Sequence, residues 1–416
     1  VRPEKVAVFL RPGRRRDSYK RIWKNFTWEK ETPPVFRLKE VTIAPRSSGG
    51  SQLSIECLVT ADKVAYRGVS LENASGNVKG RVPGKVALRD FRAIHNGSEM
   101  SGDVAFSEKH RAGLEVNFSG SLDPWTILTA MNKEWRQYSE HYDFAVPSEL
   151  HVKGFIPFAD NYGPRLYGDI KTSAFTAFGL QFGDVHASWG VKDTALNVRY
   201  FNGTLADGDV KFTASHDFLA ETSTLDVKCD GIKLKSLVES VDAWETLKTK
   251  GKISGHADVT VHQSGSQDNQ QPKLIGEGQI ELRESDLWQM PLLTQLGKLL
   301  RASLVRKITG LGNITELSAD FFFAGDHVRV SKFETDGSIV ALRGDGEYKW
   351  QGRKPDFRIR GVLLKETGII PWLTQALSWA FEVRLHGTLQ DPKYEMISAI
   401  QKKLWGRKEQ RQKKEK

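Results

Sequence analysis

Cysteine is nearly absent from this chain: its 416 residues include only Cys57 and Cys229. Two thiols cannot build the disulfide framework of a small secreted scaffold or a cysteine-rich zinc site. Both lie in segments of alternating apolar and polar residues, where a cysteine packs as a small hydrophobic side chain. The sequence leaves open whether a single long-range disulfide joins them.

Long apolar runs are absent as well. No segment reaches the roughly 20 apolar residues that span a bilayer. The longest candidate, residues 368–383, is interrupted by Pro371 and by several polar residues. The chain starts at Val1, without a Met and without a secretory signal pattern. We therefore expect a fragment or a processed product of a longer protein.

Sequence signatures of catalysis are missing too. The chain contains no Gly-x-Ser-x-Gly elbow, no Walker loop and no His-Glu-x-x-His pair. The best metal candidate places His256, Asp258 and His262 on one face of a strand. A strand rises about 3.3 Å per residue, which separates the two histidines by roughly 20 Å, too far to share an ion. We therefore expect no metal, no cofactor and no enzymatic activity. The sequence leaves open a carbohydrate-active enzyme, because the paired carboxylates of such an enzyme can lie far apart in the chain.

Net positive charge is absent from the body of the chain, despite a net charge of +10. Residues 1–24 carry nine Lys/Arg and two Asp/Glu, a balance of +7, and residues 402–416 carry eight and two, a balance of +6. Residues 25–401 therefore carry 10 − 13 = −3. A nucleic-acid-binding domain concentrates basic residues on its folded face, so we expect no nucleic acid as a partner. Basic ends suit an anionic membrane surface, and we place Lys402 and Lys403 at such a contact.

What the chain does have is an alternation of apolar and polar residues with a period of two. Residues 114–119, 225–230 and 381–386 alternate strictly between apolar and polar side chains. Such segments are strands with one apolar and one solvated face, the antiparallel pattern. The pairs Asn96-Gly97 and Asn202-Gly203 follow apolar strands and predict tight hairpin turns. We therefore expect a mainly β fold.

A loose internal repeat indicates a stack of hairpin units. In each copy an apolar strand leads to a phenylalanine, then to an Asn-Gly or Asp-Gly pair, and then to a Gly-Asp pair. The copies run through Val86, Phe91, Asn96 and Gly102; through Leu196, Phe201, Asn202 and Gly208; and through Val328, Phe333, Asp336 and Gly344. The Gly-Asp pairs are 106 and 136 residues apart, so the unit is irregular.

The sequence also predicts three helices between the strands. Apolar residues recur at helical spacing in residues 123–138, 291–300 and 371–380. We expect each helix to pack its apolar stripe on a sheet or, as the sharper alternative, on a membrane surface. In the last of these helices we take Trp372, Leu373 and Leu377 as membrane-contact residues.

The last third of the chain combines several motifs in a fixed order. They are Gly276-Glu277-Gly278-Gln279-Ile280, Asp286-Leu287-Trp288, Pro291-Leu292-Leu293, the strands at 317–323, 328–330 and 342–348, and the closing segment from Gly387 to Pro392. This order resembles the C-terminal region of the AsmA-like family of bacterial envelope proteins, the group of AsmA, TamB and YhdP. A weaker similarity, to the repeated strands and short helix that lie upstream in such proteins, runs from Tyr167 to Leu237.

The resemblance implies both a fold and a function. Members of that family are anchored in the inner membrane and extend into the periplasm as a long β-sheet, whose apolar inner face carries phospholipid. The implied fold is an elongated antiparallel sheet of hairpin repeats, curved into a groove, with a few short amphipathic helices. The implied protein is periplasmic and is tethered to the inner membrane by a segment outside this chain. It would guide phospholipid toward the outer membrane, support outer-membrane biogenesis, and contact phospholipid, a membrane surface and other envelope proteins.

Eight side chains are our candidates for the lipid-binding inner face of such a groove. They are Leu196, Val198, Leu225, Val227, Phe321, Phe323, Phe381 and Val383. An apolar face is stable only when it is shielded from water, and acyl chains shield it as well as a second sheet does. The plain alternative for each residue is an ordinary core position.

We divide the chain into five parts. They are a basic segment at 1–44, a first β-repeat unit at 45–145, a second at 146–265, an AsmA-like unit at 266–395 and a basic tail at 396–416. The main alternative function is a structural or adhesion module of the envelope, built as a β-sandwich without lipid cargo. Six Asn-x-Ser/Thr sequons also leave a glycosylated secreted protein open.

Overall fold

The fold is known from a computed structural model of the whole chain. The structure describes residues 26–45, 51–66, 68–82, 86–107, 113–122, 142–144, 147–157, 163–177, 179–239, 250–262, 273–286, 296, 314–338, 340–350, 352–363, 382–388 and 391–397. The predictions for residues 123–138 and 371–380, and for both basic ends, lie outside the described residues. No helix in the described ranges is both long enough and apolar enough to cross a membrane.

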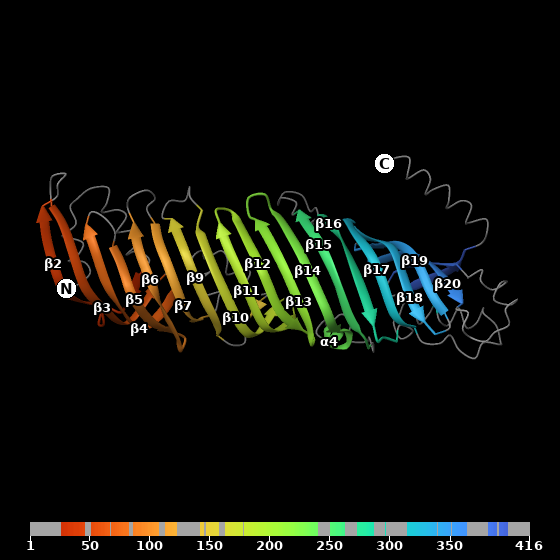
Figure 1. Ribbon diagram of the computed structural model, residues 1–416, viewed down its shortest axis with the longest axis horizontal. Coiled ribbons are helices and arrows are strands. Elements are labelled where there is room, and N and C mark those ends of the chain that lie inside the picture. The colour runs from red at the N-terminus through yellow and green to blue at the C-terminus, as the bar shows by residue number, and fades with distance from the viewer. Residues whose placement is uncertain are drawn as a thin grey trace. The chain divides into compact units, whose positions relative to one another are not determined.

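The described strands belong to one antiparallel sheet of 22 strands, which confirms the prediction of a mainly β fold built from hairpins (Figure 1). Almost every strand pairs with the next one along the chain, and the sheet does not close on itself. Within the described residues the helical content is small: α4 spans Leu234–Glu239, and Leu296 is helical. The chain divides into two compact units between Gly203 and Thr204, and each is described by itself.

The first unit, Val1–Gly203, contains the strands up to β11 and most of β12. They are β1 (Phe26–Trp28), β2 (Val35–Pro45), β3 (Ser51–Tyr66), β4 (Val69–Val82), β5 (Val86–His95), β6 (Ser98–Ser107), β7 (Gly113–Leu122), β8 (Tyr142–Asp143), β9 (Ser148–Pro157), β10 (Arg165–Ala177), β11 (Leu180–Lys192) and β12 (Ala195–Leu205).

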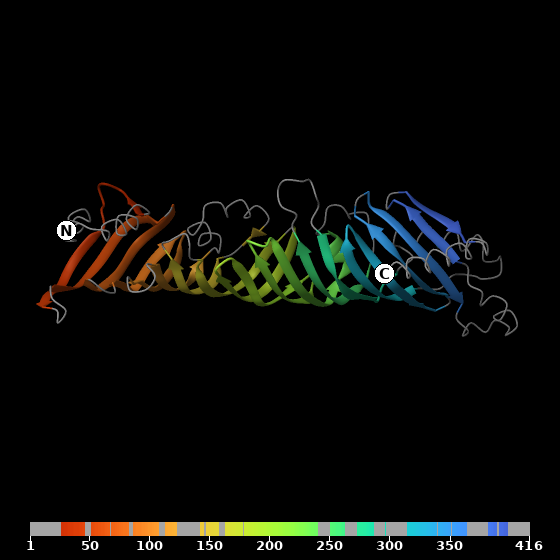
Figure 2. The ribbon, with the colours of Figure 1, turned by 90° about the horizontal axis from the view of Figure 1, so that it is seen from above.

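The second unit, Thr204–Lys416, contains the end of β12 and the remaining strands. They are β13 (Gly208–Asp217), β14 (Thr222–Lys233), β15 (Lys252–His262), β16 (Lys273–Arg283), β17 (Ile314–Gly325), β18 (His327–Gly337), β19 (Val340–Lys349), β20 (Lys354–Leu363), β21 (Glu382–Gly387) and β22 (Pro392–Met396). Figure 2 shows this sheet curving toward its last strands.

The period of two seen in the sequence separates the side chains onto two faces. In the first unit, Val116 of β7 lies directly opposite Val104 of β6, while the neighbouring Asn117 lies opposite Asp103. Because directly opposed residues share a face, an apolar row alternates with a polar row across the strands. The apolar side packs into buried clusters, one of which is centred on Val116 and Leu166.

The repeated phenylalanine has a structural reason. In β5 the register shifts between Leu88 and Phe91, and in β18 it shifts in the same way between Val330 and Phe333. Such a β-bulge turns two consecutive residues outward and returns the phenylalanine to the apolar face. Each ring then lies opposite the glycine of the repeat, Phe91 opposite Gly102 and Phe333 opposite Gly344. The glycine leaves space for an aromatic ring, since a Cβ would lie 2.7 Å from Phe118 at Gly102 and 2.5 Å from Phe333 at Gly344. Each repeated phenylalanine also meets a second ring: Phe91 meets Phe118 with the centroids 6.1 Å apart, and Phe333 meets Phe357 at 6.4 Å.

The middle copy keeps the bulge but differs in its turn. Arg199 lies over the ring of Tyr167, and the hydroxyl of Tyr200 is 3.0 Å from Nε2 of His186, so two consecutive side chains point to the polar face. The predicted turn at Asn202-Gly203 is wrong, because both residues lie within β12. The turn falls instead at Ala206 and Asp207, with φ of 47° and 62°. By contrast, Asn96 and Gly97 form the predicted hairpin turn, with φ of 47° and 79°.

Replacing Gly102 with alanine should destabilise the first unit by about 2 kcal/mol. A Cβ at this position would lie 2.2 Å from the carbonyl oxygen of Asn117 and 2.7 Å from Cδ1 of Phe118, so backbone would have to move. Gly203→Ala is the matched control, because its Cβ would lie 3.1 Å from the nearest atom, a methyl carbon of Val185. Urea denaturation of both variants tests this, and equal stabilities would contradict the ring-over-glycine arrangement.

Candidate functional site

The candidate site is the apolar face of strands β13 to β18 in the second unit. Leu225 lies opposite Ala214 and Val259, and Val227 lies opposite Phe212 and Ala257, so these side chains share one face. The apolar face is formed by Val210, Phe212, Ala214, Leu225, Val227, Cys229, Ala257, Val259, Val261, Leu274, Gly276, Gly278, Ile280, Ala319, Phe321, Phe323, Val328 and Val330. Most of these side chains are partly exposed, and no second layer of described strands packs on them.

The same face is a closed core near the other end of these strands. Leu282, Ile359 and Leu385 are buried there together with Leu234 of α4. Leu296, Ile314, Val340, Leu342 and Val383 have no exposed surface at all. Leu296 belongs to a predicted amphipathic helix, and its burial against the sheet is the packing role expected for that helix. The apolar surface therefore changes from buried to partly exposed along the strands.

A row of four aromatic residues lies at the exposed end. The ring centroids of Phe321 and Phe323 are 5.4 Å apart, Phe323 stacks on Trp350 at 6.1 Å, and Tyr348 meets Trp350 edge-on at 5.9 Å. Glycines beside the row let the rings lie flat on the sheet: a Cβ at Gly278 would be 2.5 Å from Cζ of Phe321. Aromatic rings offer a large, rigid apolar contact area.

The turns next to this aromatic row form what we call the Trp350 rim, residues 325–327, 349–350 and 352–354. The backbone N–H of Trp350 donates to the carbonyl oxygen of Asp326 at 3.2 Å, which joins the two turns. Nδ1 of His327 lies 2.9 Å from a carboxylate oxygen of Asp326, and this hydrogen bond holds the pKa of Asp326 below its usual value. Lys349, Arg353 and Lys354 add fixed positive charges at the rim.

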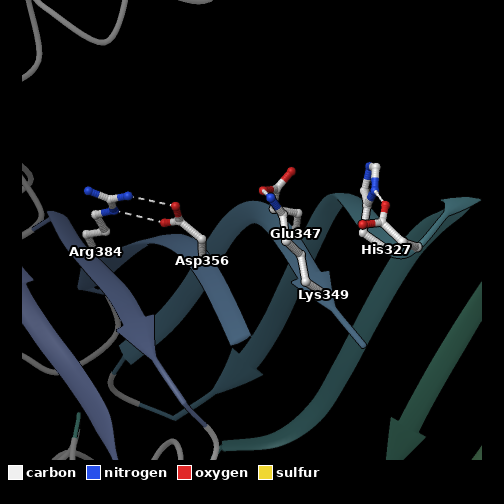
Figure 3. Close-up of polar contacts among 6 residues, drawn as sticks. His327, Glu347, Lys349, Asp356 and Arg384 are labelled. Carbon is white, nitrogen blue, oxygen red and sulfur yellow. Dashed lines mark hydrogen bonds and ion pairs between the residues drawn. The ribbon is translucent and has the colours of Figure 1, made fainter. Parts of the chain in front are cut away.

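The opposite face of the sheet is polar, and on strands β18 to β21 several of its charges are paired. Figure 3 shows a row of side chains from Arg384 on β21 across Asp356 and Glu347 to His327 on β18. Arg384 donates to both carboxylate oxygens of Asp356, at 2.8 and 2.7 Å, and this pairing raises the pKa of Arg384. Lys349 lies 3.6 Å from Glu347. Such a face suits water, so only the other face calls for an apolar ligand.

The predicted inner-face residues fall into two groups. Leu196 packs beside the buried cluster of the first unit, and Val198 is partly exposed on the same strand. Leu225, Val227, Phe321 and Phe323 lie on the apolar face and are partly exposed. Val383 has no exposed surface and belongs to the closed core. Phe381 lies outside the described residues, as do Trp372, Leu373, Leu377, Lys402 and Lys403.

Sequence reasoning missed Tyr348 and Trp350, which complete the aromatic row. The signal was present in β19, where Tyr348 follows Gly344 and Gly346 at a spacing of two and Trp350 continues it. The first unit has a comparable aromatic stack, in which Phe175 lies between Phe144 at 4.8 Å and Phe182 at 5.9 Å.

Both cysteines are free thiols in this structure, and Cys57 is buried. Cys229 lies opposite Val210 and Gly255 on the apolar face and is partly exposed. Loss of solvation raises its pKa, the charge of Asp230 raises it further, and a backbone hydrogen bond from Gly255 acts in the opposite direction. Burial also raises the pKa of Cys57.

The described part of the apolar face offers apolar contact. The described residues contain no group of three or more His, Cys, Asp or Glu placed to hold a metal ion. His256, Asp258 and His262 lie on the polar face of β15, opposite Lys228, Asp226 and Thr222. Comparison with protein-family models, curated proteins and solved structures gave no match to this chain.

Proposed function

We propose that this protein binds phospholipid acyl chains on the apolar face and guides lipid between the two membranes of a bacterial envelope. The observation that carries the proposal is the partly exposed apolar face, which extends over six consecutive strands from β13 to β18 without a second layer of described strands. A soluble protein rarely leaves so large an apolar surface without a ligand or partner.

The energetics of burial support an acyl chain as the ligand. Each methylene removed from water contributes about 0.8 kcal/mol, so ten methylenes contribute about 8 kcal/mol before the cost of association. This is enough for binding without a polar site, in keeping with a face that carries no charged side chain between Leu225 and Phe323 in its cross-strand rows.

The resemblance to the AsmA-like family supports the cellular setting of the proposal. In that setting the protein is periplasmic, is tethered to the inner membrane, and supports outer-membrane biogenesis together with other envelope proteins. The open single sheet also differs from the two facing sheets of a β-sandwich, the architecture assumed for the alternative adhesion module.

Native mass spectrometry of the gently purified protein, followed by lipid extraction, tests the proposal. We expect phospholipid to be retained in stoichiometric amount, because the apolar face gains more from acyl chains than from water. Cys229 provides a second readout: reloading delipidated protein with phospholipid should slow its alkylation. The assay is best run above pH 9, since a raised pKa keeps the thiol protonated and unreactive at lower pH. A stable protein that retains no lipid and shows no protection of Cys229 would contradict the proposal.

A further inference from the structure

The apolar face has a direction along its strands. From the Trp350 rim, successive cross-strand rows descend toward the closed core, because residues of β16 to β19 are in register. The first row contains Gly276, Phe323, Val328 and Tyr348; the second Gly278, Phe321, Val330 and Gly346; the third Ile280, Ala319, Phe333 and Gly344; and the fourth Leu282, Leu317, Thr335 and Leu342.

Burial increases from the first row to the fourth. Phe323, Val328 and Tyr348 are all partly exposed, and none belongs to a buried cluster. In the fourth row Leu282 is 5% exposed and Leu342 is fully buried. The fourth row is therefore the wall of the closed core, and the first two rows lie open beside the rim.

The distance from the rim to the wall of the closed core matches one acyl chain. Six residues separate Phe323 from Leu317 along β17, which corresponds to about 20 Å at 3.3 Å per residue. The hydrocarbon core of a bilayer is about 30 Å thick, so a chain that spans one leaflet extends over about 15 Å. A chain of this length fits between the rim and the closed core along the strand direction.

The two ends of this part of the apolar face differ in polarity, as the headgroup and the methyl end of a phospholipid do. At the rim, Arg353 and Lys354 are exposed, Lys349 is paired with Glu347, and the carboxylate of Asp326 is hydrogen-bonded to His327. At the other end the wall is formed by leucines. A phosphate placed at the wall would lose its hydration without a partner, whereas at the rim it stays in water beside cations.

We propose that a bound acyl chain lies along strands β16 to β19, with its methyl end beside Leu317, where the closed core begins, and its phosphate headgroup at the Trp350 rim. This orientation rests on the proposed function. It makes the binding face selective for chain length, because the wall fixes how deep a chain can reach, and tolerant of headgroup chemistry, because the headgroup stays in solvent.

Photocrosslinking of the unmodified protein tests the orientation. Two phosphatidylcholine probes are used, one with a diazirine near the headgroup end of the acyl chain and one with it near the terminal methyl. We expect the first probe to label the peptide around Val328 and the turn at Trp350, and the second to label the segments around Ile280 and Ala319. The reverse pattern, or the same pattern from both probes, would overturn the orientation while leaving lipid binding intact. Absence of crosslinks from both probes would overturn the proposed function itself.

A pair of variants on β17 provides an independent test. Ala319→Trp places a large side chain in the third row and should weaken retention of a 16-carbon phospholipid about tenfold, the effect of losing roughly two buried methylenes. A lipid with shorter chains should be affected much less. Ser318→Trp is the matched control, because Ser318 lies opposite Glu281 and Glu334 on the polar face. Equal loss for long and short chains in Ala319→Trp would overturn the orientation.

Discussion

Replacing Val383 with aspartate should unfold the second unit, with a loss of about 4 kcal/mol or more in the free energy of unfolding. Val383 has no exposed surface and is surrounded by the closed core. An ionised carboxylate there would lose its hydration without gaining a cation or a hydrogen-bond donor from its leucine and isoleucine neighbours. Urea denaturation followed by circular dichroism gives the change directly.

Met396→Asp is the matched control for this variant. Met396 lies directly opposite Val383 in the register of β21 and β22, but half of its side chain is exposed. The same carboxylate at this position can stay in water, so we expect a change within about 0.5 kcal/mol. Similar losses for the two variants would show that Val383 is not part of a closed core, and would return it to the candidate lipid-binding residues.

Replacing both Leu225 and Val227 with asparagine should weaken lipid retention on the β14 part of the apolar face about a hundredfold while leaving the fold intact. Both residues are partly exposed on the apolar face, so the folded protein can hydrate the new amides. An acyl chain cannot do so, and each amide that it covers costs about 1–3 kcal/mol. Two such amides weaken binding by roughly 3 kcal/mol, which is about a hundredfold.

The control carries the same two asparagines on the other face of the same strand. Thr224 and Asp226 alternate with the mutated pair and lie on the polar face, opposite Thr260 and Asp258. Thr224→Asn with Asp226→Asn should therefore retain lipid at the level of the parent protein. Lipid content is measured by extraction after gel filtration, and an equal loss in both double variants would argue against binding on the apolar face.

The strands could be predicted from the sequence because their periodicity is a local property. Alternation at residues 114–119 and 225–230 corresponds to β7 and β14, and the hairpin at Asn96 follows from the φ values that asparagine and glycine tolerate. The identical pair at Asn202 failed, because Gly203 continues strand β12 and the turn falls at Ala206 and Asp207. The dipeptide alone does not distinguish these two uses of glycine.

The division of the apolar face into a partly exposed part and a closed core could not be predicted from local periodicity. Val227 and Val383 each alternate with polar neighbours, and nothing in their local sequence separates them. What separates them is cover by residues distant in the chain: Leu296 and Leu234 contribute to the core that buries Val383, whereas Val227 stays partly exposed. Alternation predicts which face a residue lies on, but burial depends on what packs over that face.

The pairing of nearly every strand with its neighbour in the chain has a consequence for folding. Contacts such as those of β3 with β4 and β13 with β14 close only short loops, so these hairpins can form once their two strands and turn are available. A single-layer sheet of this kind approaches a one-dimensional array, in which each strand depends mainly on the two beside it. Folding can begin at any well-formed hairpin, such as the one around Asn96, and then extend strand by strand.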